Sequence, residues 1–92
     1  MWLNVPKYSK LLNLDQYSDI CIVTINEERG LYELSAYEAG SSNCANLLIS
    51  PCSFEHAQKQ LSNIIRSLSK GVKVCRVYAE DETASQDNDD ND

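Results

Sequence analysis

The segment from Ser53 to Gly71 constrains the fold more than any other part of the sequence, because it predicts one long amphipathic helix. Its apolar residues recur at steps of three and four, which places them on one face of a helix. They are Phe54, Ala57, Leu61, Ile64, Ile65 and Leu68. Charged and hydroxyl side chains occupy the other side. We therefore expect the apolar face to supply much of the buried surface of the domain.

Both ends of this helix carry residues that suit them. The Ser53 hydroxyl can accept a hydrogen bond from a first-turn N–H that has no partner within the helix. Glu55 in the first turn and Lys70 in the last place charges that the helix dipole favours. Gly71 can adopt the left-handed conformation that ends many helices. The sequence thus predicts a helix that starts after Ser53 and stops before Gly71.

Four segments around the helix predict strands. Residues 20–25 are almost entirely apolar or β-branched, which is typical of a central strand covered on both faces. A charged turn ending in Gly30 leads to residues 31–39, where apolar and polar side chains alternate. Residues 46–50 supply a third strand of this meander. Residues 72–78 predict a last strand that follows the helix and returns along the same sheet.

The first nineteen residues are less regular. Residues 2–5 suit a short first strand or an extended arm, which Pro6 ends. Residues 7–19 fit a loop with at most one short helix or strand. The expected helix and strands together predict an α+β fold, in which one long helix packs on one face of a mostly antiparallel sheet of four or five strands.

The chain length of 92 residues allows one small domain, which we place at residues 1–78. Residues 79–92 consist mainly of Asp, Glu, Asn, Ser and Gln and almost lack apolar residues, so they predict a disordered acidic tail. The net charge of −6 belongs to this tail, because the body has seven acidic residues against eight Lys or Arg. The acids of the tail are Glu80, Asp81, Glu82, Asp87, Asp89, Asp90 and Asp92.

Cys44, Cys52 and His56 form a candidate thiol cluster. Zinc ligands usually come in tight C-x2-C or H-x3-H pairs, which the spacing C-x7-C-x3-H lacks. A thiol enzyme needs a nucleophile beside a base, and no oxyanion loop completes such a site here. His56 falls off the centre of the apolar stripe, where we expect a surface imidazole. We therefore expect no enzyme, no metal and no cofactor, and keep a thiol- or metal-dependent protein as an alternative.

Basic residues gather on the exposed side of the helix and on the last strand. They are Lys59, Arg66, Lys70, Lys73 and Arg76. Such cations could contact phosphates, but the body is nearly neutral and the acidic tail would compete for the same patch. No glycine-rich phosphate-binding motif is present. We interpret these residues as a solvated face and do not expect direct nucleic-acid binding.

The sheet predicts a protein partner, because a single helix cannot cover both of its faces. Leu31 and Tyr37 lie on the face opposite the predicted core, and we take them as partner-binding candidates. Trp2 is a third candidate, as an anchor for another subunit, although we favour its burial because large aromatic residues more often serve cores. We expect a non-catalytic protein-interaction module that acts as a homodimer or docks on a larger complex.

The acidic tail suggests an alternative function. In size and charge the chain resembles small acidic inhibitors of nucleic-acid-binding machinery, some of them encoded by phages, although it shares no motif with any one family. That resemblance implies a tail that mimics a phosphate backbone and blocks a nucleic-acid-binding protein. No apolar run approaches the ~20 residues that cross a bilayer, and the start lacks the pattern of a secretory signal. We therefore expect no membrane partner and a cytoplasmic location with reduced cysteines.

Overall fold

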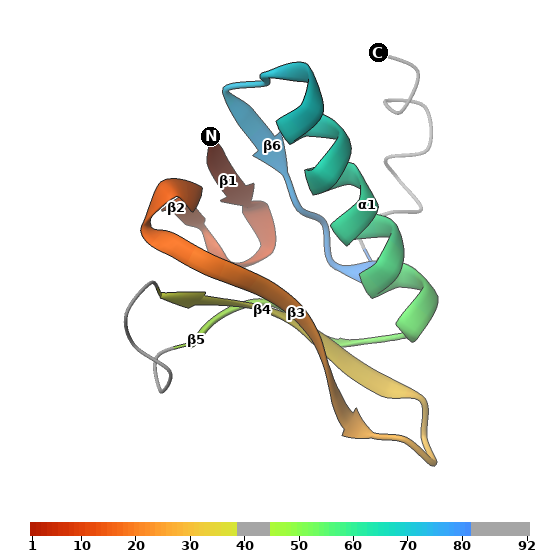
Figure 1. The fold of residues 1–92 in the computed structure, drawn as a ribbon. Helices are drawn as coiled ribbons and strands as arrows, with labels where there is room; N and C mark the ends of the chain where they lie inside the picture. The colour runs from red at the N-terminus through yellow and green to blue at the C-terminus, as the bar shows by residue number, and fades with distance from the viewer. Residues whose placement is uncertain (39–44, 82–92) are drawn as a thin grey trace.

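A computed structural model of the chain describes residues 1–38 and 45–81 and shows an α+β fold, as the sequence predicts. The strands form two three-stranded sheets, and the single described α-helix packs against both of them (Figure 1). In chain order the elements are β1 (Trp2–Val5), β2 (Lys10–Asn13), β3 (Tyr17–Asn26), β4 (Leu31–Glu38), β5 (Ala45–Cys52), α1 (Phe54–Lys70) and β6 (Val74–Arg76).

The predicted meander is present as the sheet β3-β4-β5, in which both pairs of neighbouring strands are antiparallel. The prediction that residues 20–25 form its central strand is wrong. They belong to β3, an edge strand without a fully buried residue, whereas β4 lies in the middle and buries Leu34, Ser35 and Ala36. β-Branched composition suits any half-buried pleated surface, so it does not distinguish edge from centre.

The prediction of one sheet with four or five strands is also wrong, because β6 does not return to the meander. It pairs in parallel with β1, and β2 pairs antiparallel with the other side of β1, giving a second sheet of order β2-β1-β6. Leu3 lies opposite Cys75 in this sheet, and both side chains are buried. The alternation of residues 72–78 marks a strand but carries no information on its partner.

Residues 7–19 are more ordered than the predicted loop. They contain β2 and all or part of two 3-10 turns, Pro6–Tyr8 and Leu14–Gln16, before β3 begins. β2 exists because β1 offers it a partner, with Leu12 directly opposite Leu3. The Asn13 side chain then caps the second turn by accepting a hydrogen bond of 3.1 Å from the backbone N–H of Asp15.

The ends of α1 are as predicted. The Ser53 hydroxyl accepts a hydrogen bond of 3.2 Å from the backbone N–H of His56, and Gly71 ends the helix with a φ of +70°. The buried face is only partly the predicted one. Ala57 and Ile64 are buried, but Phe54, Ile65 and Leu68 are exposed. In the described part of the chain, no helix has both the length and the apolar character needed to cross a membrane.

Two polar side chains of α1 are buried in the protein interior, where we expected apolar side chains of the same helix. His56 is only 6% exposed, so its predicted surface position is wrong, and Gln60 is buried as well. Both contact the backbone of Tyr78, just after β6: the Gln60 side-chain oxygen accepts from Tyr78 N at 3.0 Å, and His56 Nε2 donates to Tyr78 O at 2.7 Å. The segment after β6 is therefore held against α1 by side chains instead of by a strand.

One core joins the two sheets and the helix. Leu3, Val5 and Val77 come from the side of β1 and β6, Leu34 and Ile49 from the meander, and all are almost fully buried. The core continues to Ala79, which the sequence places in the disordered tail. The packed body therefore reaches past residue 78, and residues 82–92 lie outside the described part of the chain.

The hydrogen bond from Tyr78 N to Gln60 makes a testable prediction. Gln60→Met keeps the volume of the side chain but leaves a buried N–H without its acceptor, so we expect a loss of about 2 kcal/mol in the free energy of unfolding. Urea unfolding measures this change. Gln58→Met, at an exposed position of the same helix, is the matched control and should change stability by less than about 0.5 kcal/mol. Equal effects of the two substitutions would contradict the role assigned to Gln60.

Candidate interaction surface

Trp2 lies at an exposed apolar corner of the molecule. It is 43% exposed, so the burial that we favoured for it is wrong. Its backbone N–H donates to the carbonyl of Lys73 at 2.8 Å, which holds it beside the start of β6. With Leu68, Val72 and Lys73 it lines a shallow hollow of about 410 Å³ at the C-terminal end of α1. The aromatic ring is thus presented at the surface by β1.

A second hollow, of about 560 Å³, adjoins the first and shares Leu68 with it. One wall is the helix, through Leu61, Ile65 and Leu68, and the other is the chain from Leu14 to Ile20. Asp15 and Asp19 also line this hollow, whereas Lys73 lines the first one. We call the exposed or half-buried aliphatic residues and the tryptophan of the two hollows the apolar surface: Met1, Trp2, Leu14, Ile20, Leu61, Ile65, Leu68 and Val72.

The other two partner-binding candidates lie elsewhere. Leu31 and Tyr37 are half-buried near opposite ends of β4, on the face of the meander that points away from α1. At the centre of that face the Ser35 hydroxyl donates to the Glu33 carboxylate at 3.0 Å. This face is therefore mixed in character, and the structure does not bring Leu31 and Tyr37 together with Trp2.

Sequence reasoning missed most of the apolar surface, because it assigned Ile65 and Leu68 to the core. The signal that could have identified them is the width of the helical stripe. An apolar face that spans Phe54 to Leu68 and includes both Ile64 and Ile65 is wider than one sheet contact needs. Where the buried part of a stripe ends depends on tertiary neighbours, which the periodicity does not contain.

The candidate thiol cluster is not assembled as a reactive site by the described residues. Cys52 is buried and its Sγ contacts the carbonyl of Tyr32 at 3.5 Å, whereas the His56 ring donates to Tyr78. Burial raises the pKa of the Cys52 thiol, and the carboxylates of Glu80 and Glu33 raise it further. Cys52 therefore stays a neutral thiol, the less nucleophilic form. Cys44 lies outside the described residues.

The remaining thiols do not extend the cluster. Cys21 is exposed on β3, and Cys75 is buried on β6. Across residues 1–38 and 45–81, no group of three or more His, Cys, Asp or Glu side chains is placed to hold a metal ion. The described geometry thus offers neither an activated nucleophile nor a metal cage.

Two acids of the predicted tail contact the body. The Glu80 carboxylate accepts hydrogen bonds from the backbone N–H of Ser53 at 3.0 Å and from its hydroxyl at 2.7 Å. Because the same hydroxyl caps the N–H of His56, Glu80 extends the N-terminal cap of α1. Asp81 forms an exposed ion pair with Lys7 at 3.2 Å. The other five acids, from Glu82 to Asp92, lie outside the described residues.

No protein-family model matches this sequence, and comparison with curated proteins and with solved structures finds no significant match. Function must therefore be inferred from the residues of the chain itself.

The contact between Glu80 and Ser53 predicts a pH-dependent contribution to stability. The two hydrogen bonds from Ser53 lower the pKa of Glu80 below its ordinary value of 4.5, against a smaller opposing effect of burial. A group whose pKa is lower in the folded state adds stability above its unfolded pKa and loses it as the pH falls through the folded pKa. Because Glu80 is exposed, solvent screens the contact, and Glu80→Gln should cost no more than about 1 kcal/mol at pH 7. The difference from wild type should shrink as the pH falls below 4.5.

Urea unfolding at a series of pH values checks this. Glu28→Gln, in the exposed turn between β3 and β4, is the matched control and should show no such pH-dependent difference. A difference between wild type and Glu80→Gln that stays constant down to strongly acidic pH would contradict the Ser53–Glu80 contact.

The burial of the thiols predicts an order of chemical reactivity. In the native protein, Cys21 should react with iodoacetamide at close to the rate of a free thiol, whereas Cys52 and Cys75 should react at least about 100-fold more slowly. Peptide mass spectrometry after timed labelling measures each cysteine separately. In denaturant the three rates should converge. Fast native labelling of Cys52 would revive the thiol alternative.

Proposed function

We propose that the protein is a non-catalytic interaction module that pairs with a second copy of itself through the apolar surface. The observation that carries this proposal is the exposure of Leu68 and Ile65 on α1 beside exposed Trp2 and Val72, in a domain of this small size. Contiguous apolar surface rimmed by polar residues is typical of a protein interface. Small cores also gain stability from self-association.

The shape of the apolar surface favours a second copy as the partner. A two-fold interface uses the same patch on both subunits, so the patch must carry both a projection and a matching depression. Here the exposed Leu68 stands between two hollows of about 410 and 560 Å³. A two-fold axis near Leu68 would set the projection of each copy against a hollow of the other.

The charges at the two ends of the apolar surface suit the same arrangement. Lys73 lines the hollow at the C-terminal end of α1, and Asp15 and Asp19 line the other. Asp15 already pairs with the N-terminal amine of Met1 at 3.6 Å, so Asp19 is the acid that Lys73 of a second copy would meet. A two-fold axis between the hollows reverses the direction of the surface in the second copy, so Lys73 would approach the acidic end of its partner. Such complementarity selects the register of an interface more than it adds affinity.

The chemistry of the described residues favours binding over catalysis. The imidazole of His56 and the thiol of Cys52 are committed to backbone carbonyls inside the protein. Every buried side-chain nitrogen and oxygen in the described part of the chain has a hydrogen-bond partner. The polar interior thus serves to hold the fold together, and the surface is what remains for function.

The dimer is tested at Leu68. We expect the wild-type protein to be a dimer at tens of micromolar, and Leu68→Glu to weaken self-association about 100-fold, because it places a charge at the centre of the interface. Light scattering coupled to size-exclusion chromatography, with sedimentation equilibrium for the dissociation constant, measures both.

Ile25→Glu is the matched control, because Ile25 is 47% exposed against 52% for Leu68 but lies near the far end of the β3–β4 hairpin (Figure 1). It should leave the dimer intact. Circular dichroism confirms that both variants stay folded. A wild-type chain that is monomeric at these concentrations, or a control that dissociates as readily as Leu68→Glu, would contradict the proposal.

A further inference from the structure

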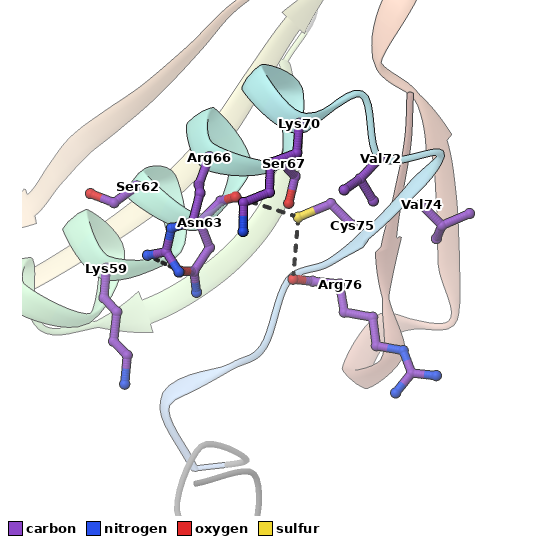
Figure 2. Close-up of a pocket in the computed structure, with 10 residues that line it drawn as sticks. All are labelled: Lys59, Ser62, Asn63, Arg66, Ser67, Lys70, Val72, Val74, Cys75 and Arg76. Carbon is purple, nitrogen blue, oxygen red and sulfur yellow. Dashed lines mark hydrogen bonds between the residues drawn. The ribbon is translucent and has the colours of Figure 1, made fainter. Parts of the chain in front are cut away.

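A basic groove runs along a different side of α1, between the helix and β6. It has a volume of about 640 Å³ and ten lining residues, shown in Figure 2. Four of them are cations: Lys59, Arg66, Lys70 and Arg76. The remaining lining residues are Ser62, Asn63, Ser67, Val72, Val74 and Cys75, so no lining residue within 1–38 and 45–81 is acidic. We refer to this feature as the basic groove.

The charges of the groove lack acidic partners on its helical side. Arg66 donates to the Asn63 side chain at 3.1 Å, a neutral acceptor from the same helix. Among residues 1–38 and 45–81, no carboxylate lies within ion-pair distance of Lys59, Arg66 or Lys70. Like charges that gather along one groove repel each other, and a bound anion would relieve that repulsion.

We propose that the basic groove is a binding site for a polyanion and that its resident ligand is the chain's own acidic segment, residues 82–92. The segment contains Glu82, Asp87, Asp89, Asp90 and Asp92 and no basic residue. It therefore complements the three cations on the helical wall of the groove, Lys59, Arg66 and Lys70, whereas the Arg76 side chain points away from the helix (Figure 2). Four of its five acids fall within its last six residues, which concentrates the charge far from the point of attachment.

The length of the segment suits the groove. Glu80 is hydrogen-bonded to Ser53, the N-cap residue of α1, so the described chain ends near the N-terminus of the helix. At 1.5 Å per residue along a helix, Lys59 lies roughly 9 Å from Ser53 along the axis and Lys70 roughly 25 Å. Eleven residues span at most about 36 Å when extended. The acids from Asp87 onward can therefore reach the helical cations Lys59, Arg66 and Lys70.

Attachment makes this ligand hard to displace. A ligand tethered by a short linker acts at an effective concentration in the millimolar range, so even a weak ionic contact is largely formed. An external polyanion, such as single-stranded nucleic acid, must compete with it. The acidic segment thereby competes with external polyanions for the groove and excludes those that bind weakly.

The test uses the full chain and a neutral-tail variant with Glu82→Gln, Asp87→Asn, Asp89→Asn, Asp90→Asn and Asp92→Asn. Backbone amide NMR spectra of the two proteins should differ at the lining residues of the groove in low salt. The differences should vanish at high salt, because exposed ion pairs are screened. Identical groove signals in low salt would overturn the proposal.

Binding of a fluorescent oligothymidylate gives a second readout. The neutral-tail variant should bind it about tenfold more tightly than wild type at low salt, because the competing ligand is gone. In the neutral-tail background, Lys59→Gln with Arg66→Gln should abolish this gain. Arg29→Gln, which removes one cation in the exposed β3–β4 turn, should not.

The remaining outcomes are also decisive. If the oligonucleotide binds wild type and neutral-tail protein equally tightly through Lys59 and Arg66, the groove is open to external nucleic acid and the proposal fails. If the groove signals respond to the tail but neither protein binds the oligonucleotide, the groove is specific for the acidic segment and the assignment of its ligand holds.

Discussion

The structure depends on the hydrogen bonds that α1 makes to the backbone of Tyr78. His56 and Gln60 lie one turn apart on the helix and together satisfy both the N–H and the carbonyl of that residue. Without them, the segment after β6 would enter the core with unpaired backbone groups, each costing on the order of 1–3 kcal/mol. With them, Val77 and Ala79 can pack beside Leu3 and Val5, and Glu80 can reach the first turn of the helix.

The surface of α1 has three parts, and the buried part includes the polar side chains of His56 and Gln60. One part, around His56, Ala57 and Ile64, is buried. A second, around Ile65 and Leu68, contributes to the apolar surface, and a third, around Lys59 and Arg66, forms a wall of the basic groove. A single helix thus anchors the core and presents two chemically different surfaces. The two surfaces share Val72, so each proposal is tested at residues that belong to one surface alone: Leu68 for the dimer, and Lys59 with Arg66 for the basic groove.

The features that the sequence predicts well are those set by near neighbours in the chain. The bounds of α1 follow from Ser53 and Gly71, and the order β3-β4-β5 follows from short connections between antiparallel strands. The parallel pairing of β1 with β6 and the burial of His56 depend on partners far away in the sequence. Similarly, the composition of residues 79–81 indicates disorder, but tertiary contacts with Ser53 and Lys7 hold them. Trp2 was identified as a surface candidate, whereas Leu68 was not, because the helical stripe does not show where its buried part ends.

The pairing of the first strand with the last has a consequence for how the chain folds. β1 pairs with β6, which lies more than seventy residues later in the sequence. One side of β1 therefore stays unpaired until almost the whole body has been synthesised. The meander and the helix contain mostly local contacts and can form earlier. During translation, Leu3 and Val5 therefore lack the cover that Cys75 and Val77 give them until those residues have emerged. The pairing of β1 with β6 is then a late step in folding, and it fixes both ends of the body in the native structure.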